Sequence, residues 1–415
     1  MTDKATDPAI SEHPLEEGER ITLPIPRSVP TEVAEEYTRL RGERPVCPVT
    51  LRTGEPALLV TRHDDLKTVL TDRRFSRAAV CDDDAQKTGA VRPNPDTIIN
   101  MDPPRHARIR KLAAEAFTQE RMGKLRPRIE RIVEELVEEV ASMTPPVDLI
   151  GAFARPLPLR IICEMLGVPF ADRDRIVGWV EVIMTITSTS EGVIGAYVEM
   201  RGYFAELVES KRQNLGEGFL SALAPWSDEG DRLTESELIS LGTFLLVAGH
   251  ETSVTVITDA VLQLIRHPDQ LADLLADKSL LDGAVEGMLR VGIPGVSPFP
   301  RIATTDIALR DEVIPQGTAV VVNYETALRD PEVFGSGAEA DPEAFDIRRK
   351  PLSQVFFGPG PHFCLGAPVA RMELEYGIWG LFRRFPGLRL AIPAEELKWK
   401  DFAALGNYEE FPVTW

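Results

Sequence analysis

The chain has 415 residues, of which 65 are acidic and 46 are Lys or Arg, so its formal net charge is −19. Such a negative charge makes nucleic acid and anionic membrane surfaces poor partners. The four cysteines include no C-x-x-C pair, which argues against both a disulfide scaffold and a zinc site.

Residues 1–30 are polar and acidic, and they lack the basic start and the apolar core of a signal peptide. No window is apolar enough for a membrane span. We therefore expect a cytoplasmic protein. No Gly/Ser-rich linker or low-complexity run divides the sequence, which predicts one domain over residues 1–415 with an irregular segment at 1–30.

The predicted elements are mostly helices with a few short strands, so the expected fold class is mainly α with small β-sheets (α+β). In chain order, the first half predicts a strand at 55–60 and helices at 63–70, in MDPPRHARIRKLAAEAF, at 119–143, within 145–169 and at 199–213. The second half predicts a helix at 268–281, a small sheet at 302–322 around the turn Pro315-Gln316-Gly317, and irregular chain at 330–349.

The longest helical pattern begins at a capping box, Thr234-x-x-Glu237, and runs to about His267. At 1.5 Å per residue it spans roughly 50 Å and must cross the whole domain. Its flanks are apolar, and its middle reads Ala248-Gly249-His250-Glu251-Thr252. These polar residues exclude a transmembrane helix.

For His250 we favour a tolerated polar residue on a solvent-facing turn, and for Glu251 and Thr252 we favour a function. Gly249 weakens the helix, and the Thr252 hydroxyl can bond back to the carbonyl four residues earlier. We therefore expect the helix to open locally and admit water or dioxygen at this point.

One cysteine, Cys364, lies in a frame suited to a metal ligand. Gly358, Gly360 and Gly366 let the backbone fold tightly around the sulfur and point N–H groups at it, and a helix begins directly afterwards. The other three cysteines, Cys47, Cys81 and Cys163, are interpreted as small core residues. A single sulfur without companion ligands indicates a metal already held by another ligand set, and a porphyrin supplies four nitrogens of its own.

The spacing Phe357-Gly358-x-Gly360-x-His362-x-Cys364-x-Gly366 resembles the haem-ligand signature of the cytochrome P-450 monooxygenases, and the chain looks like the soluble bacterial type. The resemblance implies a buried haem b beneath the long central helix, with the Cys364 thiolate as the axial iron ligand. It also implies that Thr252 holds the oxygen being activated and that Glu251 relays protons to it. Ala248, Gly249 and Phe357 are expected to contact the cofactor.

His106 and Arg110 stand at i and i+4, so they share one helix face and could clamp carboxylates. By resemblance, both bind a haem propionate together with Arg301, which opens a strand, and His362. The neighbouring cations could form a binding surface for an acidic electron carrier. They are Arg105, Arg108, Lys111 and Arg371.

One position departs from the family pattern. A helical Glu-x-x-Arg motif is expected at 287–290, but the chain reads Gly287-Met288-Leu289-Arg290. Arg349 is the expected later partner of Arg290, so two arginines would face each other without the acid. We expect Glu286, another acid or backbone carbonyls to take over the missing charge.

Electrons are expected from a separate ferredoxin and ferredoxin reductase, because the sequence holds neither a dinucleotide-binding fingerprint nor a ferredoxin cysteine cluster. Apolar and small residues predict a pocket for a hydrophobic small molecule, such as a bacterial secondary metabolite. The candidate substrate residues are Phe244, Val247, Ser297, Phe299, Leu405 and Asn407.

The leading hypothesis is hydroxylation or epoxidation of that molecule with dioxygen and two electrons. The first alternative is oxidative aromatic or C–C coupling, for example of cyclic dipeptides, in which no oxygen enters the product. The second, from another class, is a non-catalytic haem-binding sensor, and the intact Glu251-Thr252 pair argues against it.

Overall fold

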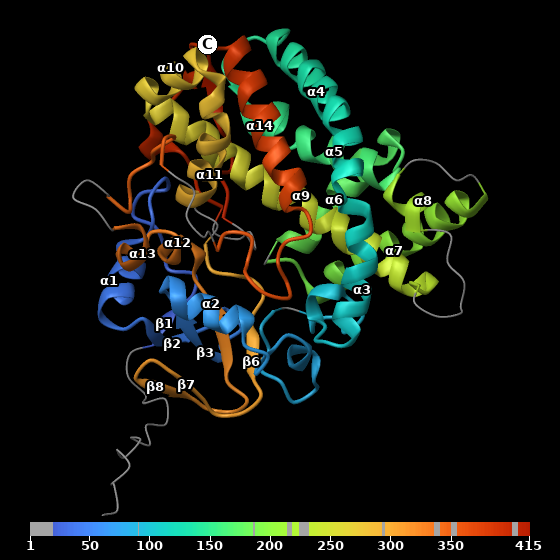
Figure 1. Ribbon diagram of the computed structural model, residues 1–415, viewed down its shortest axis with the longest axis vertical. Coiled ribbons are helices and arrows are strands. Elements are labelled where there is room, and N and C mark those ends of the chain that lie inside the picture. Colours follow the sequence, from blue (N-terminus) through green and yellow to red (C-terminus); the bar gives the residue numbers. More distant parts are fainter. Residues whose placement is uncertain are drawn as a thin grey trace, which may run out of the picture.

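The computed structural model describes residues 20–89, 91–185, 187–213, 218–223, 232–292, 295–335, 341–349, 355–400 and 406–415. Most strands gather on one side of the molecule with several short helices near them, and long helices build most of the rest (Figure 1). The predicted class, mainly α with small β-sheets, is confirmed.

The long helices of the helical part are α4, α7, α9 and α14. The bounds of the helices are α1 Glu35–Glu43, α2 His63–Thr71, α3 Arg105–Ala114, α4 Gln119–Ala141, α5 Pro156–Leu166, α6 Arg173–Met184, α7 Ser190–Gln213, α8 Phe219–Leu223, α9 Glu235–Arg266, α10 Pro268–Ala276, α11 Leu281–Val291, α12 Tyr324–Ala327, α13 Pro331–Phe334 and α14 Ala367–Arg384.

The strands are short. They are β1 Ile21–Thr22, β2 Val46–Thr50, β3 Pro56–Val60, β4 Phe75–Ser76, β5 Val147–Asp148, β6 Arg301–Ala303, β7 Ile307–Leu309, β8 Glu312–Ile314, β9 Ala319–Val322, β10 Arg389–Leu390 and β11 Pro412–Thr414. Six of them form one sheet in the order β1-β2-β3-β9-β6-β4. In this sheet β3 pairs parallel with β9, and β6 pairs antiparallel with β4. Strand β6 begins with Arg301, so segments far apart in the sequence position this residue. The small sheet of β5, β10 and β11 packs within the helical part.

The predicted elements correspond to β3, α2, α3, α4, α5, α10, the strands β6 to β9, and the helix after Cys364. The prediction at 199–213 was too short, because α7 begins at Ser190. Val193, Ala196 and Met200 give this part a buried face, but Gly192 and Gly195 weaken the periodic pattern. The predicted irregular segment contains only the short α13, and residues 336–340 lie outside the described ones.

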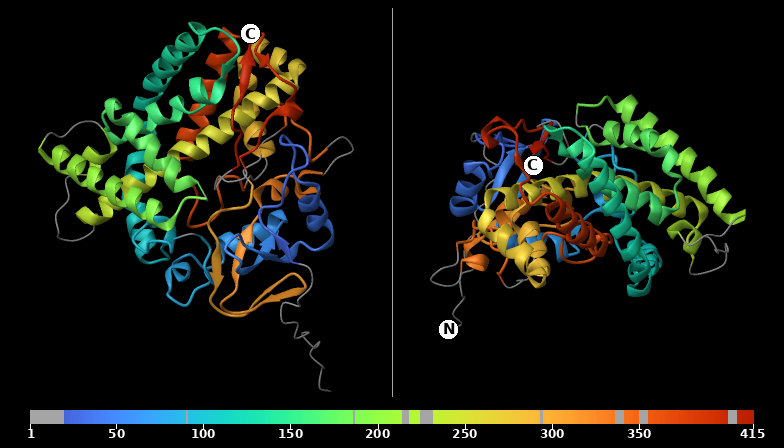
Figure 2. Two further views of the ribbon diagram at one scale, coloured as in Figure 1. Left: turned by 180° about the vertical axis from the view of Figure 1, so that it is seen from behind. Right: turned by 90° about the horizontal axis from the view of Figure 1, so that it is seen from above.

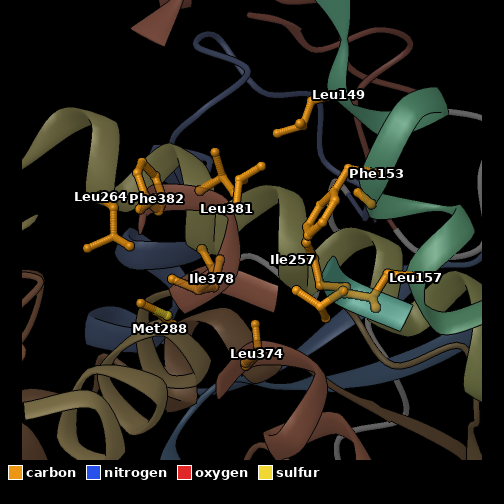
Figure 3. Close-up of a cluster of buried hydrophobic side chains, with 14 of the residues drawn as sticks. Leu149, Phe153, Leu157, Ile257, Leu264, Met288, Leu374, Ile378, Leu381 and Phe382 are labelled. Atoms are coloured by element: carbon orange, nitrogen blue, oxygen red, sulfur yellow. The ribbon is translucent and has the colours of Figure 1, made fainter. Parts of the chain in front are cut away.

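The core of the helical part lies between α5, α9, α11 and α14. Figure 3 shows Leu157, Ile257, Met288 and Ile378 from these four helices pointing toward one another. The two views of Figure 2 show α9 passing through the helical part rather than along its surface. This packing fixes α14, and with it the cysteine loop that precedes α14, against α9.

Helix α9 starts as predicted. The Thr234 side chain accepts from the Glu237 N–H, and the Glu237 carboxylate accepts from the Thr234 N–H, which completes the capping box. Among the described residues, α9 is the one helix long and apolar enough to cross a membrane, and 72% of its most apolar window is buried inside the protein. The expectation that no window is apolar enough for a membrane span was therefore wrong on composition, but such burial is typical of a core helix.

Candidate haem site

The loop before α14 is built around Cys364. The Cys364 N–H donates to the Phe357 carbonyl at 2.9 Å, which closes the loop. Gly358 and Gly360 have φ values of 70° and 87°, a region that side chains with a Cβ rarely adopt. A Cβ at Gly360 would also stand 2.8 Å from the Leu70 carbonyl oxygen. The predicted role of the glycines in shaping the loop agrees with this geometry.

The Cys364 side chain is exposed, whereas Cys47 and Cys163 are buried and Cys81 is half-buried. Burial of the sulfur by the surrounding chain raises the pKa of the Cys364 thiol, while the N–H groups of Gly366 and Ala367 and the charge of Arg110 lower it. The loop thus offers a sulfur that is accessible from one side and is supported by N–H dipoles on the other. A positive partner, such as a metal ion, would complete its stabilisation as a thiolate.

The four predicted carboxylate-binding residues come together. The His106 and His362 rings lie 4.1 Å apart between centroids, and Arg110 donates to the carbonyl of Phe363, next to His362. Arg301 is only 6% exposed, donates to the Phe75 carbonyl at 3.2 Å, and leaves its Nε without a partner. Segments far apart in the sequence therefore meet at the cysteine loop.

Arg77 belongs to the same cluster of positive groups, and sequence reasoning missed it. Its guanidinium is buried and donates to the Ile99 and Pro300 carbonyls and to Asn100 Oδ1. Nothing in the motif around Arg77 distinguishes it from a surface arginine, and only the fold buries it. The charge of Arg77, together with those of Arg110 and Arg301, adds to burial in lowering the pKa of His362.

The cluster has a composition that fits the two propionates of a haem. Burial is the largest cause of the low pKa of both His106 and His362, and the neighbouring cations lower these values further. Arg301 keeps an unused buried donor, and unused buried donors are costly. An anionic group with two carboxylates would satisfy these donors and offset the charge, so the residues present fit the group.

On α9, the Thr252 hydroxyl donates to the Ala248 carbonyl at 2.6 Å, as predicted. Thr252 is exposed although its neighbours on α9 are largely buried, which indicates an open space beside this turn. A Cβ at Gly249 would stand 3.3 Å from Ile162 of α5, so Gly249 permits close helix packing. The expected opening of the helix is absent, because α9 is continuous from Glu235 to Arg266.

The interpretation of His250 as a solvent-facing residue was wrong, because its ring is completely buried. Two residues along a helix correspond to about 200° of rotation, so His250 lies on the side of α9 opposite Thr252, where α5 covers it. Its Nδ1 lies 3.6 Å from Glu251 Oε1. Burial raises the pKa of the Glu251 carboxyl, partly opposed by Arg155 and Lys400.

Backbone carbonyls take over the role of the missing acid at Gly287, which was one of the three expected solutions. Arg290 donates to the carbonyls of Pro342, Ala344 and Leu328. Glu286 does not replace the acid, because it pairs with Arg371. Arg349 likewise donates to two carbonyls, those of Phe334 and Asp341.

The candidate substrate residues have different surroundings. Phe244 is half-buried on α9, Val247 is 9% exposed, and Phe299 is 44% exposed with the Arg77 guanidinium 5.6 Å from its ring centroid. Ser297 Oγ accepts from the Phe299 N–H, and Asn407 Oδ1 accepts from the Tyr408 N–H, so both polar groups already have local partners. Leu405 lies outside the described residues.

The described residues contain no group of three or more His, Cys, Asp or Glu side chains that could hold a metal ion. A metal in this part of the protein would therefore need ligands from another source, as sequence reasoning also indicated. A haem iron meets this condition, because the porphyrin supplies the equatorial ligands.

The cytochrome P450 family model matches residues 181–388. Nocardicin C N-oxygenase of Nocardia uniformis subsp. tsuyamanensis is 39% identical over 91% of this chain and 94% of its own length. Mycinamicin IV hydroxylase/epoxidase of Micromonospora griseorubida is 39% identical over 92% of this chain and 96% of its own. The solved structure of cytochrome P450mel 107F1, described as having biaryl coupling reactivity, is 34% identical with a TM-score of 0.88, covering 96% of this chain and 100% of that one.

The chain belongs to the cytochrome P450 family. It has the fold of that family and is an oxidoreductase of the monooxygenase type, and the family implies a haem-thiolate cofactor.

Proposed function

We propose that this protein binds haem b through the Cys364 thiolate and hydroxylates or epoxidises a hydrophobic small molecule. The proposed substrate class is a bacterial secondary metabolite. The observation that carries the proposal is the convergence of an accessible cysteine in a glycine-shaped loop with the cluster of His106, Arg301 and His362. The bound haem supplies the iron at which dioxygen is activated with two electrons.

In this proposal His106, Arg110, Arg301 and His362 bind the propionates. Phe357 supports the thiolate side, where the Arg371 guanidinium lies 4.6 Å from its ring centroid. Ala248 and Gly249 lie on the other side, where the small Ala248 side chain leaves room for a flat cofactor and Gly249 lets α9 pack closely against Ile162 of α5.

Thr252 and Glu251 handle protons. The Thr252 hydroxyl donates to Ala248 O and can instead present its proton or a lone pair to the open space beside α9. Burial raises the pKa of the Glu251 carboxyl, which favours its protonated form and suits a group that passes on a proton, as general acid catalysis requires.

The substrate side is built from Phe244, Val247, Ser297, Phe299 and Asn407, which are mostly apolar. Such a wall suits a bulky hydrophobic ligand with few polar groups. The names of two relatives, nocardicin C N-oxygenase and mycinamicin IV hydroxylase/epoxidase, support a secondary metabolite as the substrate class.

The cofactor assignment is tested by the reduced carbon monoxide difference spectrum of the purified protein. We expect the spectrum typical of a thiolate ligand, and we expect Cys364→Ser to abolish it. The matched control is Cys81→Ser, which replaces a half-buried cysteine and should leave the spectrum unchanged. Loss of the signal in the control rather than in Cys364→Ser would contradict the assignment.

The reaction is tested by screening hydrophobic natural products for a change in the haem absorption spectrum, followed by turnover of the hits. Turnover in labelled dioxygen should add one labelled oxygen atom to the product. Hits that bind but never turn over with any ferredoxin pair would favour the sensor instead.

A second candidate is oxidative coupling, favoured by the structural similarity to cytochrome P450mel 107F1 and its reported biaryl coupling reactivity. The same labelling experiment separates the two, because coupling joins two carbon atoms, removes two hydrogen atoms and leaves the product unlabelled.

We also propose that a ferredoxin and a ferredoxin reductase deliver the electrons in the cytoplasm. Burial of most of α9 supports that location. Of the cations expected to dock the ferredoxin, Arg105, Arg108 and Arg371 pair with Asp96, Glu237 and Glu286. The pairing leaves Lys111 as the stronger candidate, so Lys111→Glu should slow reduction by ferredoxin more than Arg108→Glu.

A further inference from the structure

His250 is a buried polar residue for which the proposed chemistry does not yet account. Its ring is 0% exposed, and neither ring nitrogen has a hydrogen-bond partner among the described residues. Two unused nitrogens at one buried ring are rare, because an unsatisfied buried polar group destabilises the fold. A helix as apolar as α9 would pack more favourably with leucine at this position.

The unused nitrogens lie near two charged side chains, Glu251 and Arg155. Nδ1 of His250 lies 3.6 Å from Glu251 Oε1. On the α5 side stands Arg155, whose Nε is also buried without a partner. The main chain of Arg155 approaches the ring closely enough to influence it, but the contact falls short of hydrogen-bond geometry.

The charged groups around this pair come from four elements. Glu251 is on α9, Arg155 is the N-cap residue of α5, Glu181 is on α6, and Lys400 is near the C-terminus. Burial and the charge of Arg155 lower the pKa of His250 to about 4, so the ring is neutral at neutral pH. A neutral imidazole carries one N–H and one lone pair.

We infer that His250 is a positioning residue for Glu251: its Nδ1 lone pair accepts a hydrogen bond from the protonated Glu251 carboxyl and holds that carboxyl turned into the protein. A rotation of the Glu251 side chain closes the 3.6 Å separation to hydrogen-bond distance. The proton stays on the carboxyl oxygen, and the imidazole N–H stays on Nε2.

This arrangement gives Glu251 two positions. Held by His250, the carboxyl keeps its proton away from the Thr252 side of α9. Released, it can turn toward Lys400 and Arg155, whose charges favour the ionised form. His250 therefore sets when the proton is available, without touching the substrate or the cofactor. The inference rests on the proposed role of Glu251 as the proton donor.

The contact itself can be measured without any substrate. In protein loaded with haem, reduced and bound to carbon monoxide, the ring nitrogens of the six histidines are followed by nitrogen-15 NMR, and His250→Phe assigns the His250 signals. We expect Nδ1 of His250 to be unprotonated and to shift in one step as Glu251 titrates. Glu251→Gln should remove that step.

His267 is the internal control, because its Nδ1 lies 2.8 Å from the Gln263 carbonyl near the end of α9. Its signals should be the same in the native protein and in Glu251→Gln. The inference is overturned if the nitrogen-15 shift of His250 does not change when Glu251 titrates. It is also overturned if His250 Nδ1 carries the ring proton. Absence of a carbon monoxide complex would instead count against the proposed haem site.

A second test of the inference uses turnover kinetics with a substrate found in the screen. Without His250 the protonated Glu251 loses support, so in His250→Phe the alkaline limb of the turnover profile should move about one unit to lower pH. The fraction of NADPH recovered as product should fall several-fold. His250→Asn places an acceptor oxygen near the Nδ1 position and should restore both. Equal profiles for the native protein and His250→Phe overturn the inference.

Discussion

Two regions of this protein bury several arginines, and they differ in how the guanidinium groups are satisfied. Around Arg290, Arg329 and Arg349 most donors bind backbone carbonyls, and Glu343 pairs with Arg329 at 3.1 Å. Arg290 alone binds three carbonyls, although its Nε has no partner among the described residues. Arg301 binds one carbonyl in the described chain, that of Phe75, and its Nε also has no partner there. Buried positive charge alone does not mark a ligand site. A buried guanidinium with few partners within the chain is the better mark.

The largest expected effect separates the two regions directly. Arg301→Gln should weaken haem binding at least tenfold and change the unfolding of the haem-free protein much less, because the Arg301 side chain donates to one carbonyl in the described chain. Arg290→Gln should do the reverse and lower the free energy of unfolding by about 3 kcal/mol, since three carbonyls lose their donor. Haem titration and urea unfolding of the haem-free variants measure both, and equal behaviour of the two variants would contradict the distinction.

The second prediction concerns a buried acid far from any arginine partner. Glu373 on α14 is 3% exposed, accepts from Ser253 Oγ, and has its pKa raised by burial to about 8. Between the ordinary carboxyl value and pH 8 the unfolded chain releases this proton and the folded chain keeps it. The contribution to stability is therefore lost with rising pH, by about 1.4 kcal/mol per unit within that window.

Glu373→Gln should remove this slope, so the variant gains stability relative to the native protein as pH rises from 5 to 8. Urea unfolding at several pH values measures it. Glu120→Gln is the control, because Glu120 is on the surface and pairs with Lys124 four residues away. Parallel pH curves for the native protein and Glu373→Gln would refute the assignment of a buried neutral carboxyl.

A smaller effect is expected at Glu343, the acid that serves the Arg290 region. Its carboxylate pairs with Arg329 and lies 3.5 Å from Arg41, and both arginines are buried. Because Glu343 is half exposed and water screens it, Glu343→Gln should cost only about 1–2 kcal/mol of unfolding free energy. Haem affinity should not change. If Glu343→Gln instead lost haem affinity at unchanged stability, the distinction between the Arg290 region and the Arg301 region would be contradicted.

The smallest effect tests the departure at Gly287. A Cβ there would stand 3.1 Å from the Asp346 carbonyl oxygen, so Gly287→Ala should destabilise the protein slightly. Gly287→Glu adds the same Cβ together with a carboxylate facing Arg290 and should recover about 1 kcal/mol relative to alanine. Melting temperatures of both variants provide the comparison. Glutamate no better than alanine would mean that the carbonyls already satisfy Arg290 completely.

The sequence was sufficient to predict most helices, the capping box of α9, the shape of the cysteine loop and the Thr252 hydrogen bond, because each depends on residues close together in the chain. The meeting of His106 with His362 was predicted only through the family resemblance, since no local pattern links residues so far apart.

The burial of His250 and Arg77 could not be predicted from local pattern. Helical periodicity places His250 opposite Thr252, but it cannot tell that α5 covers that side. Likewise, the carbonyls that satisfy Arg290 come from a segment without regular structure, where no periodicity exists to be read.

The cysteine loop takes its shape from other parts of the chain. Gly360 packs against the Leu70 carbonyl, and Gly358 lies beside the Tyr324 hydroxyl. In a polypeptide synthesised from its N-terminus, α2 and α12 exist before the loop emerges, and domains tend to fold in that order. Contacts between such distant segments form slowly. The loop that would hold the cofactor is thus completed among the last parts of the fold.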